Sequence, residues 1–514
     1  MRSLLLSLFL TVVAGGFYAL CYPSVFGNGW LPLLFIALPF FLWRLEVAPT
    51  LKSTLLHVLA FNLGLNLIGY YWIPHTLREF GELPYVISIL LGAIFSIILQ
   101  PHWWFYAVWK KYRPELEWYS ERGILVTAFV MTILERYIPQ QFPSFAGSPW
   151  LNMSPYLGLA PVLGVVAFSF MTYWVSLEVF TQLALKKFRP QVWIALTIFI
   201  ILNAVNPLSD KPSDKVIPVR IVQANIGNFL KIQSERGDTN SFESVIKKYE
   251  SLSTLDNGFK PELIVWPETA YPNTFYGTQT QLGDNFHRII DVTGAEMLVG
   301  GYDQDMNKSP MDFFETVFNS SILISSGKFK SAYHKNILIP FGETLPFGPL
   351  NSTIVSIVPA VSLFARGIGT PQMETAQGHR FVTPICYEIL ESNYMRSLLN
   401  QWGNNKFIVN HTNDSWYGDT AEPHQHLFLS KWRALEFNLP IVRSTNTGIT
   451  SVIFPDGSES KRLNVGETGA LDVNVPLGTG EATFYQTYGV YPLVGIFAIF
   501  FLITWIREKR LFRQ

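Results

Sequence analysis

Three residues in this sequence supply a nucleophile, a base and a cation at the ends of apolar stretches. Cys386 follows an apolar run at 381–385, and Glu268 follows another at 263–267. Lys335 stands at the edge of a third apolar segment. A carboxylate removed from water gains proton affinity, and an ammonium group stabilises a thiolate and later an oxyanion. The set therefore predicts nucleophilic catalysis, with Glu268 as the base and Lys335 holding Cys386 as a thiolate.

Each of the three residues also has an ordinary structural explanation. Cys386 can be a packed core cysteine, Glu268 a helix-capping carboxylate and Lys335 a solvated lysine. Taken singly, these explanations are preferred. Cys21, the other cysteine, lies in an apolar run near the N-terminus, so Cys386 has no disulfide partner in its own domain. Together, a Glu, a Lys and a Cys that each end a β-type run are much harder to explain by chance than any one of them alone.

Alternating strand and helix patterns predict the domain that positions these residues, over 217–475. Short stretches of β-branched or apolar residues flanked by Gly, Pro or Asn predict strands, and amphipathic stretches predict helices. We expect strands at Val219–Gln223, Leu263–Trp266, Glu296–Gly300, Ser320–Ser325, Arg380–Cys386, Phe407–Asn410 and Ile449–Phe454, and helices at Phe242–Leu252 and His426–Phe437. Such alternation is typical of a layered α/β sandwich. The polar stretches 206–216 and 476–482 are expected to be linkers.

The rest of the chain has the composition of a membrane protein. Only 15% of all residues are charged, against roughly 25% in soluble proteins. Eight apolar runs have about the length of a membrane-crossing helix. They are Ser3–Leu20, Trp30–Trp43, Ser53–Ile73, Tyr85–Trp109, Ile124–Ile138, Tyr156–Phe180, Val192–Val205 and Tyr488–Ile506. We therefore expect an α-helical bundle of seven transmembrane helices in 1–205, and an eighth with a basic tail in 485–514. A cleavable signal peptide is the alternative for the first run, but six spans follow it before the linker.

Basic residues predict the orientation of these spans, because Lys and Arg resist translocation. One set of alternate short loops and the termini carry Arg2, Arg44, Lys52, Lys110, Lys111, Arg113, Arg122, Lys186, Lys187, Arg189, Arg507, Lys509, Arg510 and Arg513. The opposite loops hold only Arg78 and Arg136. Both termini are thus expected in the cytoplasm, with residues from about 206 to 484 outside. Glu135 and Arg136, near the outer end of the fifth span, either contact lipid head groups or pair at a helix end.

One apolar segment of the exported domain does not suit an ordinary soluble fold. From Ile337 to Phe364 the chain is nearly all apolar apart from Glu343, and four prolines interrupt it. It is too short and too broken to cross a bilayer. A buried core segment is one explanation. The explanation we favour is that the segment forms a lid over an apolar site close to the membrane.

Charge and ligand chemistry exclude other classes of function. The 38 basic and 38 acidic residues cancel, which gives no basic face for nucleic acid. His411, His424, His426 and Cys386 carry metal-binding groups, but their spacing is too loose to specify a zinc site. We expect neither a metal nor another cofactor.

The motifs around the three residues resemble a known family. Trp266-Pro267-Glu268, His334-Lys335 and Ile385-Cys386-Tyr387-Glu388 are similar to the Glu, Lys and Cys motifs of the nitrilase superfamily. Further stretches narrow the resemblance to the apolipoprotein N-acyltransferase family, with the same order of membrane helices. They are Gln223–Ile226, Pro340–Glu343, Asn413–Gly418, Gln425–His426, Arg433–Glu436 and Arg443–Ile449.

The resemblance implies a nitrilase-like αββα catalytic domain in the periplasm, anchored in the inner membrane. Cys386 would take an acyl chain from a phospholipid as a thioester and pass it to the α-amine of a diacylglyceryl apolipoprotein. Glu268 would serve as base, while Lys335 and the Tyr387 backbone N–H would hold the oxyanion. Glu343, Tyr387 and Glu388 would support the site. A monomer is expected.

Two other functions stay open at this point. A membrane-tethered amidase or nitrilase-type hydrolase would share the three catalytic residues but release its acyl group to water. A non-catalytic membrane receptor could use the α/β domain to bind lipid or peptide. The presence of all three catalytic residue types counts against the receptor.

Overall fold

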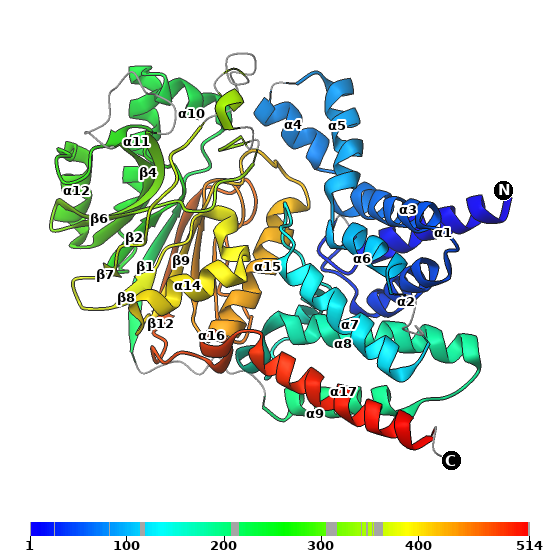
Figure 1. Ribbon diagram of the computed structural model, residues 1–514. Coiled ribbons are helices and arrows are strands. Elements are labelled where there is room, and N and C mark those ends of the chain that lie inside the picture. The colour runs from blue at the N-terminus through cyan, green and yellow to red at the C-terminus, as the bar shows by residue number, and fades with distance from the viewer. Residues whose placement is uncertain are drawn as a thin grey trace. The chain divides into compact units, whose positions relative to one another are not determined.

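The chain folds into a helical unit and an α/β unit (Figure 1). The helical unit comprises Met1–Leu77, Leu83–Leu208 and Thr483–Gln514, and the α/β unit Arg78–Glu82 and Ser209–Ala482. The computed structural model describes residues 2–511 apart from 25, 82, 114–118, 207–214, 305–315, 341, 346–347, 352 and 354–362. Within the expected lid, 337–364, residues 341, 346–347, 352 and 354–362 therefore lie outside the described residues.

The helical unit forms a helix within each of the apolar runs. Its helices are α1 (Arg2–Ala19), α2 (Leu31–Val47), α3 (Leu51–Gly69), α4 (Ile73–Gly81), α5 (Tyr85–Ile98), α6 (His102–Lys111), α7 (Glu121–Tyr137), η1 (Ser148–Met153), α8 (Ala160–Leu185), α9 (Pro190–Ala204), α16 (Phe484–Tyr488) and α17 (Tyr491–Leu511). Among the described residues, α3, α8 and α17 are long and apolar enough to cross a membrane. The pair α5 and α6 makes a fourth candidate if it is one bent span, and most of α1 and all of α9 form shorter apolar helices.

The fourth expected span is broken rather than continuous. Helices α5 and α6 meet at an angle of 45°. Between them Gln100 has φ +49°, a left-handed conformation, and Pro101 follows it. Proline provides no backbone N–H and clashes with the preceding turn, so a helix cannot run through this point undisturbed. Length and hydropathy alone, which suggested one helix over Tyr85–Trp109, do not register this break.

Small residues allow close packing inside the helical unit. A Cβ at Gly15 of α1 would overlap the backbone of Phe61, and one at Gly64 of α3 would overlap the backbone of Val12. Contact of this kind between backbones is typical of helices packed in lipid.

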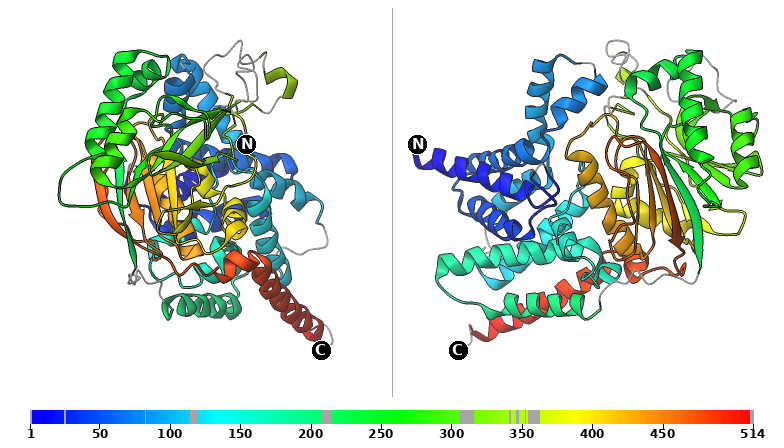
Figure 2. Two further views of the ribbon diagram at one scale, coloured as in Figure 1. Left: turned by 90° about the vertical axis from the view of Figure 1, so that its left-hand side faces the viewer. Right: turned by 180° about the vertical axis from the view of Figure 1, so that it is seen from behind.

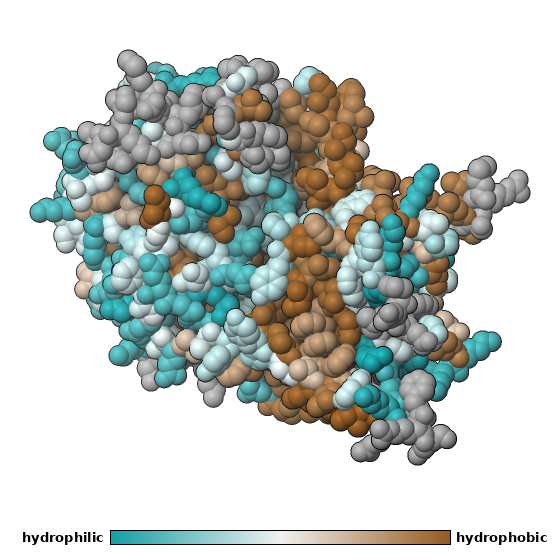
Figure 3. All heavy atoms as spheres, in the orientation of Figure 1, coloured by the Kyte–Doolittle hydropathy of each residue, from teal (hydrophilic) through white to brown (hydrophobic). Residues whose placement is uncertain are grey.

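Polar and apolar side chains of the helical unit are sorted as a membrane environment requires. Glu135 is buried, and its Oε1 accepts hydrogen bonds from the Tyr173 hydroxyl and the Ala146 N–H, both at 2.7 Å. These contacts favour a structural role for Glu135 over contact with lipid head groups, with Tyr173 and Ala146 as its partners. Apolar side chains instead gather on the surface of this unit (Figure 3). The exposed ones include Leu90, Ile94 and Ile97 of α5, Ile198 and Leu202 of α9, and Leu502 and Ile503 of α17. A patch of this extent fits contact with lipid.

The α/β unit contains two sheets. One runs in the order β12 (Gly469–Pro476), β1 (Val216–Gln223), β2 (Leu263–Trp266), β4 (Glu296–Gln304), β5 (Val317–Ser325) and β6 (Lys328–His334), and β3 (Thr274–Phe275) also pairs with β4. The other runs in the order β11 (Ser451–Ile453), β10 (Ile441–Thr445), β9 (Phe407–Thr412), β8 (Arg380–Val382) and β7 (Met373–Glu374). The central strands β1, β2 and β4, and β10, β9 and β8, are parallel.

Helices cover the outer faces of both sheets (Figures 1 and 2). Outside the first sheet lie α10 (Asn228–Glu235), α11 (Thr239–Ser253) and α12 (Asp284–Thr293), and outside the second lie α14 (Ser392–Trp402) and α15 (Glu422–Phe437). A core that includes Trp266, Tyr249 and Phe286 fills the space between the first sheet and its helices. The expected layered α/β sandwich is confirmed.

The second sheet differs from the expected strands in strand lengths and in an additional strand. The strand expected to reach Cys386 ends at Val382, because Pro384 has no N–H to donate to a ladder, and Cys386 opens the short helix η3 (Cys386–Leu390). Ile441–Thr445 forms the fully buried strand β10, which we did not expect. The expected strand at 449–454 is present as the shorter β11.

Candidate active site

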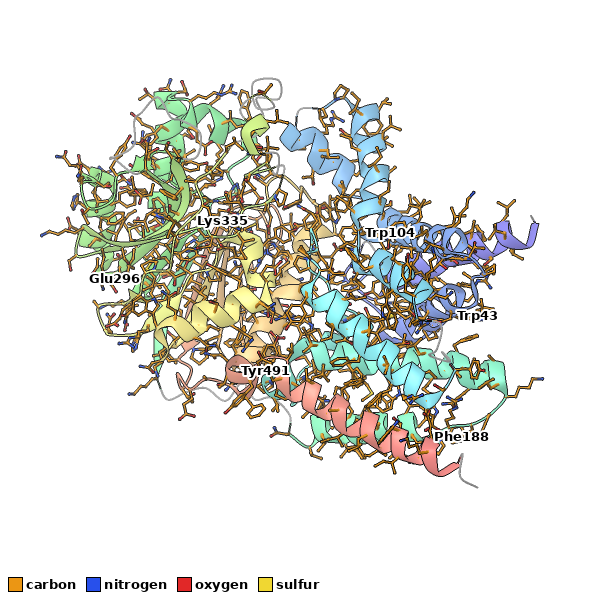
Figure 4. All side chains as sticks on the ribbon, viewed as in Figure 1. Trp43, Trp104, Phe188, Glu296, Lys335 and Tyr491 are labelled. Carbon is orange, nitrogen blue, oxygen red and sulfur yellow. The ribbon has the colours of Figure 1, made fainter. Side chains whose placement is uncertain are left out.

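Glu268 and Lys335 meet in a buried ion-pair group at the ends of β2 and β6. Lys335 Nζ lies 3.2 Å from Glu268 Oε1 and 2.7 Å from Glu343 Oε1. Asn319 of β5 donates hydrogen bonds to the same two oxygens, at 2.8 Å and 3.3 Å. The Lys335 side chain is 0% exposed, and it lies among the strands of the α/β unit (Figure 4). Burial alone would lower the pKa of Lys335, but Glu268 and Glu343 hold it well above its ordinary value, so the ammonium is permanent.

Backbone geometry brings Glu268 close to the neighbouring strand. Gly300 of β4 packs against the Pro267–Glu268 peptide so closely that a Cβ at Gly300 would overlap the Pro267 carbonyl oxygen. Thr269, directly after Glu268, has φ +47°. A tight turn with little freedom thus fixes the Glu268 carboxylate at the end of its strand.

Cys386 is held in a strained conformation beside these charges. Its φ is +54°, which costs a non-glycine residue about 1–3 kcal/mol. The residue is 4% exposed. Burial and the Glu268 carboxylate raise the pKa of the Cys386 thiol well above its ordinary value, and Lys335 only partly offsets them. The direction of this shift opposes the expectation that Lys335 holds a thiolate, and it favours a resting thiol whose proton a base must take before it can attack.

This protonation state predicts the pH dependence of thiol alkylation. A raised pKa means that the thiolate fraction grows with pH and is far from complete at about pH 8, where a free cysteine is partly ionised. In a Cys21→Ser background, the rate of Cys386 alkylation by iodoacetamide should rise through about pH 9 without a plateau. Intact mass measured against time at each pH gives the rate. A plateau reached below about pH 8 would contradict a protonated resting thiol.

Glu388 joins the segment after Lys335 to the segment around Cys386. Its Oε2 accepts hydrogen bonds from the Ile385 N–H at 2.8 Å and the Tyr333 hydroxyl at 2.6 Å. Its Oε1 accepts from the backbone N–H groups of Asn336 at 2.6 Å and Ile337 at 2.9 Å. Burial raises the pKa of Glu388 to about 7, although these hydrogen bonds oppose the rise. One buried carboxyl therefore sets the spacing between the lysine and the cysteine.

Tyr387 belongs to a second buried group, which is also where a metal ion would have to bind. Asp414, Glu422 and His426 are the group of metal-binding side chains found among the described residues, with ligand atoms within 4.8 Å of one another. The Tyr387 hydroxyl already donates to Glu422, and its ring stacks on His426 at 4.5 Å. Arg443 pairs with Asp414 at 3.1 Å. A guanidinium beside the carboxylate opposes a second cation, so the group is better suited to internal pairing than to metal binding.

His411, which carries a metal-binding ring, has a structural role between the two sheets. Burial lowers the pKa of His411 to about 4, so its ring is neutral. Nδ1 lies 2.7 Å from the Trp266 carbonyl oxygen and therefore donates to it, and Nε2 accepts from the Ser321 hydroxyl at 3.0 Å. The Thr383 hydroxyl donates to Ser321 in turn. This chain of hydrogen bonds ties β2 and β5 to β9 just below the site. His411, His424 and Cys386 are not part of the Asp414–Glu422–His426 group.

The polar residues that surround the cysteine had no role predicted from the sequence, although Asp414 and Arg443 lie in stretches that carry the family resemblance. Asn410 and Thr412 on β9, Asp414 after it and Arg443 on β10 are all buried, and Asn319 binds the two carboxylates of Lys335. Asn410 and Thr412 follow the apolar stretch 407–409. The rule that singled out Glu268, a polar residue directly after an apolar stretch, would have found Asn410 but not Thr412, which lies further along the same strand.

Comparison with known proteins agrees with both units. Residues 219–485, more than half of the chain, match the family described as carbon-nitrogen hydrolase, and residues 14–177 match the apolipoprotein N-acyltransferase N-terminal domain. The apolipoprotein N-acyltransferase of Bdellovibrio bacteriovorus is 29% identical, over 94% of this chain and 92% of its own. That of Shewanella oneidensis is 27% identical, over 92% and 91%.

Solved structures align with about half of this chain at low sequence identity. The amidase of Nesterenkonia sp. AN1 aligns with 54% of this chain and 98% of its own, with 15% identity and a TM-score of 0.37. From the two matching regions and the relatives that span nearly the whole chain, we conclude that this protein belongs to the carbon-nitrogen hydrolase family and, within it, to the apolipoprotein N-acyltransferases.

Proposed function

We propose that this enzyme transfers a fatty acyl chain from a membrane phospholipid to the α-amine of a lipoprotein's N-terminal S-diacylglyceryl cysteine. The observation that carries the proposal is the union, in one chain, of a buried Glu–Lys–Cys site with apolar helices fit for lipid. Both substrates carry acyl chains, and each CH₂ group exposed to water costs about 0.8 kcal/mol. An enzyme anchored in the bilayer can take both without exposing these chains.

Glu268, Lys335 and Cys386 carry the chemistry of this proposal. Glu268 takes the Cys386 proton, and the thiolate attacks the phospholipid ester to give an acyl thioester and a lysophospholipid. The α-amine then attacks the thioester, and Glu268 accepts the amine proton. Lys335 and the Tyr387 backbone N–H stabilise the tetrahedral oxyanion in both steps. The charged group around Lys335 supports these roles, since it is already assembled and buried before substrate binds.

Glu343, Tyr387 and Glu388 support the site in this account. Glu343 balances the charge of Lys335 and orients it, at 2.7 Å. Tyr387 is fixed by Glu422 and His426. Glu388 holds the backbone on both sides of the site, through its contacts with Ile385, Asn336 and Ile337.

Glu388→Gln should weaken both stability and acyl transfer. The amide NH₂ would face N–H donors where the carboxylate now accepts hydrogen bonds, and an unsatisfied buried group costs about 1–3 kcal/mol. We expect a lower melting temperature and a fall in turnover of more than about tenfold, because the lysine and cysteine segments lose their common anchor. Glu374→Gln, at a half-exposed carboxylate, is the control and should change neither. Wild-type turnover in Glu388→Gln would rule out this anchoring role.

Acyl transfer is distinguished from hydrolysis by its products. The purified protein in vesicles should convert phospholipid and a diacylglyceryl-cysteinyl peptide into equal amounts of N-acyl peptide and lysophospholipid, both followed by mass spectrometry. Free fatty acid that accumulates regardless of the peptide would instead identify the second candidate, a tethered amidase or hydrolase with the same three residues. Absence of any turnover would contradict both enzymes.

The proposed location is the inner membrane, with both termini in the cytoplasm and a periplasmic catalytic domain at 217–475. Transmembrane helices in 1–205 and 485–514 would anchor a monomer. The apolar surfaces of α5, α9 and α17 support a membrane location, and the basic loops support this orientation. A reporter that works only in the cytoplasm should be inactive when fused after Leu208. An active fusion would contradict the topology.

A further inference from the structure

Two polar side chains of β9 hold Cys386 at two different atoms. Asn410 Nδ2 donates a hydrogen bond to the Cys386 carbonyl oxygen at 3.2 Å. The Thr412 hydroxyl lies 3.4 Å from Cys386 Sγ and 3.1 Å from Asp414 Oδ1. Asn410 and Thr412 are both 0% exposed, so neither has water as an alternative partner. The strained backbone of Cys386 and its reactive sulfur are thus fixed by the same strand.

Arg443 closes these contacts into a ring. Its Nη1 donates to Asn410 Oδ1 at 2.8 Å, and its Nη2 donates to Asp414 Oδ2 at 3.1 Å. The ring therefore runs from Cys386 Sγ through Thr412, Asp414, Arg443 and Asn410 back to the Cys386 carbonyl. The side chains of Asp414 and Arg443 are both 0% exposed. A buried, mutually paired ring of this kind has little freedom to rearrange.

The Thr412 hydroxyl has one hydrogen and two acceptors within reach. It can donate to Asp414 or to Cys386 Sγ, but not to both at once. Burial alone would raise the pKa of Asp414, yet Arg443 and His426 hold it below its ordinary value, so this carboxylate is ionised. A carboxylate accepts more strongly than a neutral thiol, and the hydrogen points to Asp414 at rest. When the sulfur becomes a thiolate, rotation about one bond brings the hydrogen to it, while Asp414 keeps Arg443 as its partner.

We propose that Thr412 is a further catalytic residue, whose hydroxyl donates a hydrogen bond to the Cys386 thiolate whenever that thiolate forms. Asp414, Arg443 and Asn410 are positioning residues that hold Thr412 and Cys386 in place. This inference rests on the proposed acyl transfer, in which sulfur carries negative charge twice. It is the attacking group in the first half-reaction and the leaving group in the second.

Protons and bonds balance with Glu268 as the carrier. In the first half-reaction the S–H proton passes to Glu268, the C–S bond forms, the ester C–O bond breaks, and the departing oxygen takes the proton from Glu268. In the second, the C–N bond forms and an amine proton passes to Glu268. The C–S bond then breaks with its electron pair on sulfur, and Glu268 returns the proton to Cys386. Thr412 keeps its own proton throughout.

The test compares three variants of the full-length enzyme. Thr412→Val removes the hydroxyl at nearly constant volume, and Thr412→Ser keeps it. Thr445→Val is the matched control, because Thr445 faces Thr412 in the register of β10 and β9, is equally buried, and bonds to Gln223 rather than to sulfur. Two readouts are the pH profile of iodoacetamide alkylation at Cys386 and the steady-state rate of acyl transfer.

Thr412→Val should shift the alkylation profile about one pH unit higher, so that alkylation at a fixed pH is about tenfold slower. Its kcat for acyl transfer should fall about ten- to hundredfold, with KM for phospholipid within about twofold of wild type. Thr412→Ser and Thr445→Val should stay within about threefold of wild type in both readouts. If Thr412→Val does not fold, Thr412→Ala against Thr412→Ser makes the same comparison.

A wild-type alkylation profile in Thr412→Val would overturn the proposal. Rates of alkylation and acyl transfer that fall as far in Thr412→Ser or in Thr445→Val would also overturn it, because they would mean that Thr412 has a merely structural role. Alkylation needs no substrate, so either result leaves the proposed acyl transfer untouched. Failure of the wild-type enzyme to transfer an acyl chain would instead remove the proposed function on which the inference rests.

Discussion

Cys386→Ser abolishes acyl transfer in our account and leaves the protein folded. Serine fits the space of cysteine, but its hydroxyl is far harder to ionise, and Glu268 is arranged to deprotonate a thiol. The site already raises the pKa of Cys386, so a weaker acid at this position would hold its proton even more firmly. We expect turnover to fall on the order of 10⁴-fold or more. The readout is N-acylated peptide formed per enzyme in phospholipid vesicles.

Cys21→Ser is the matched control for this substitution. Cys21 is the other cysteine of the chain, equally buried, and its thiol contacts only the Phe17 carbonyl oxygen among the hydrogen bonds described. Turnover of Cys21→Ser should equal that of wild type, and both cysteine variants should melt at the wild-type temperature. Undiminished turnover of Cys386→Ser would show that the nucleophile is elsewhere.

Glu268→Gln should block formation of the thioester while phospholipid still binds. A glutamine oxygen can keep the hydrogen bonds that Lys335 and Asn319 donate to Glu268 Oε1, so the fold is preserved. An amide has no proton affinity at neutral pH, however, and the resting thiol then keeps its proton. Loss of a general base costs about 10²- to 10⁴-fold. Single-turnover acylation followed by intact mass measures this step apart from lipid binding.

Glu343→Gln distinguishes the roles of the two carboxylates that contact Lys335. Glu343 lies nearer to the ammonium, at 2.7 Å against 3.2 Å for Glu268, but it lies in a turn, whereas Glu268 follows the strand β2. We assign it charge balance and orientation, so its loss should cost less than the loss of Glu268. If Glu343→Gln blocks acylation and Glu268→Gln does not, the two assignments must be exchanged.

A simple strand-end rule located the charged centre of the site. Glu268 and Lys335 each follow an apolar or half-buried strand, and the fold brings both to the same end of one sheet. Cys386 shows where the rule weakens, since its strand stops at Val382 and a turn with positive φ presents the thiol. Sequence periodicity does not encode such a turn, although Pro384 was a sign that the strand could not continue.

The protonation state of Cys386 could not be predicted from residue types alone. A lysine near a cysteine suggests a thiolate, but the outcome depends on burial and on Glu268, whose charge opposes that of Lys335. The ring through Thr412, Asp414 and Arg443 was missed for a similar reason. Arg443 lies far from Thr412 and Asp414 in the sequence, and it meets them only because β9 and β10 are neighbours in the sheet.

The helical unit shows a different limit of prediction from sequence. Hydropathy placed a helix correctly in every apolar run, because apolar composition is what lipid contact requires. The number of membrane spans depends on the length and continuity of each helix. The break at Gln100–Pro101 divides one apolar run into two helices. Such breaks depend on local backbone chemistry, which average hydropathy does not measure.

In the proposed reaction Cys386 carries the acyl chain between the two substrates, and a measurement of intact mass shows whether it does. The enzyme is incubated with phospholipid alone, its intact mass is recorded with and without hydroxylamine, and a diacylglyceryl peptide is then added. We expect a fatty-acyl adduct on Cys386 that hydroxylamine removes and whose acyl chain passes to the added peptide. An adduct that decays to free fatty acid whether or not peptide is present, or no adduct at all, would contradict the proposed reaction.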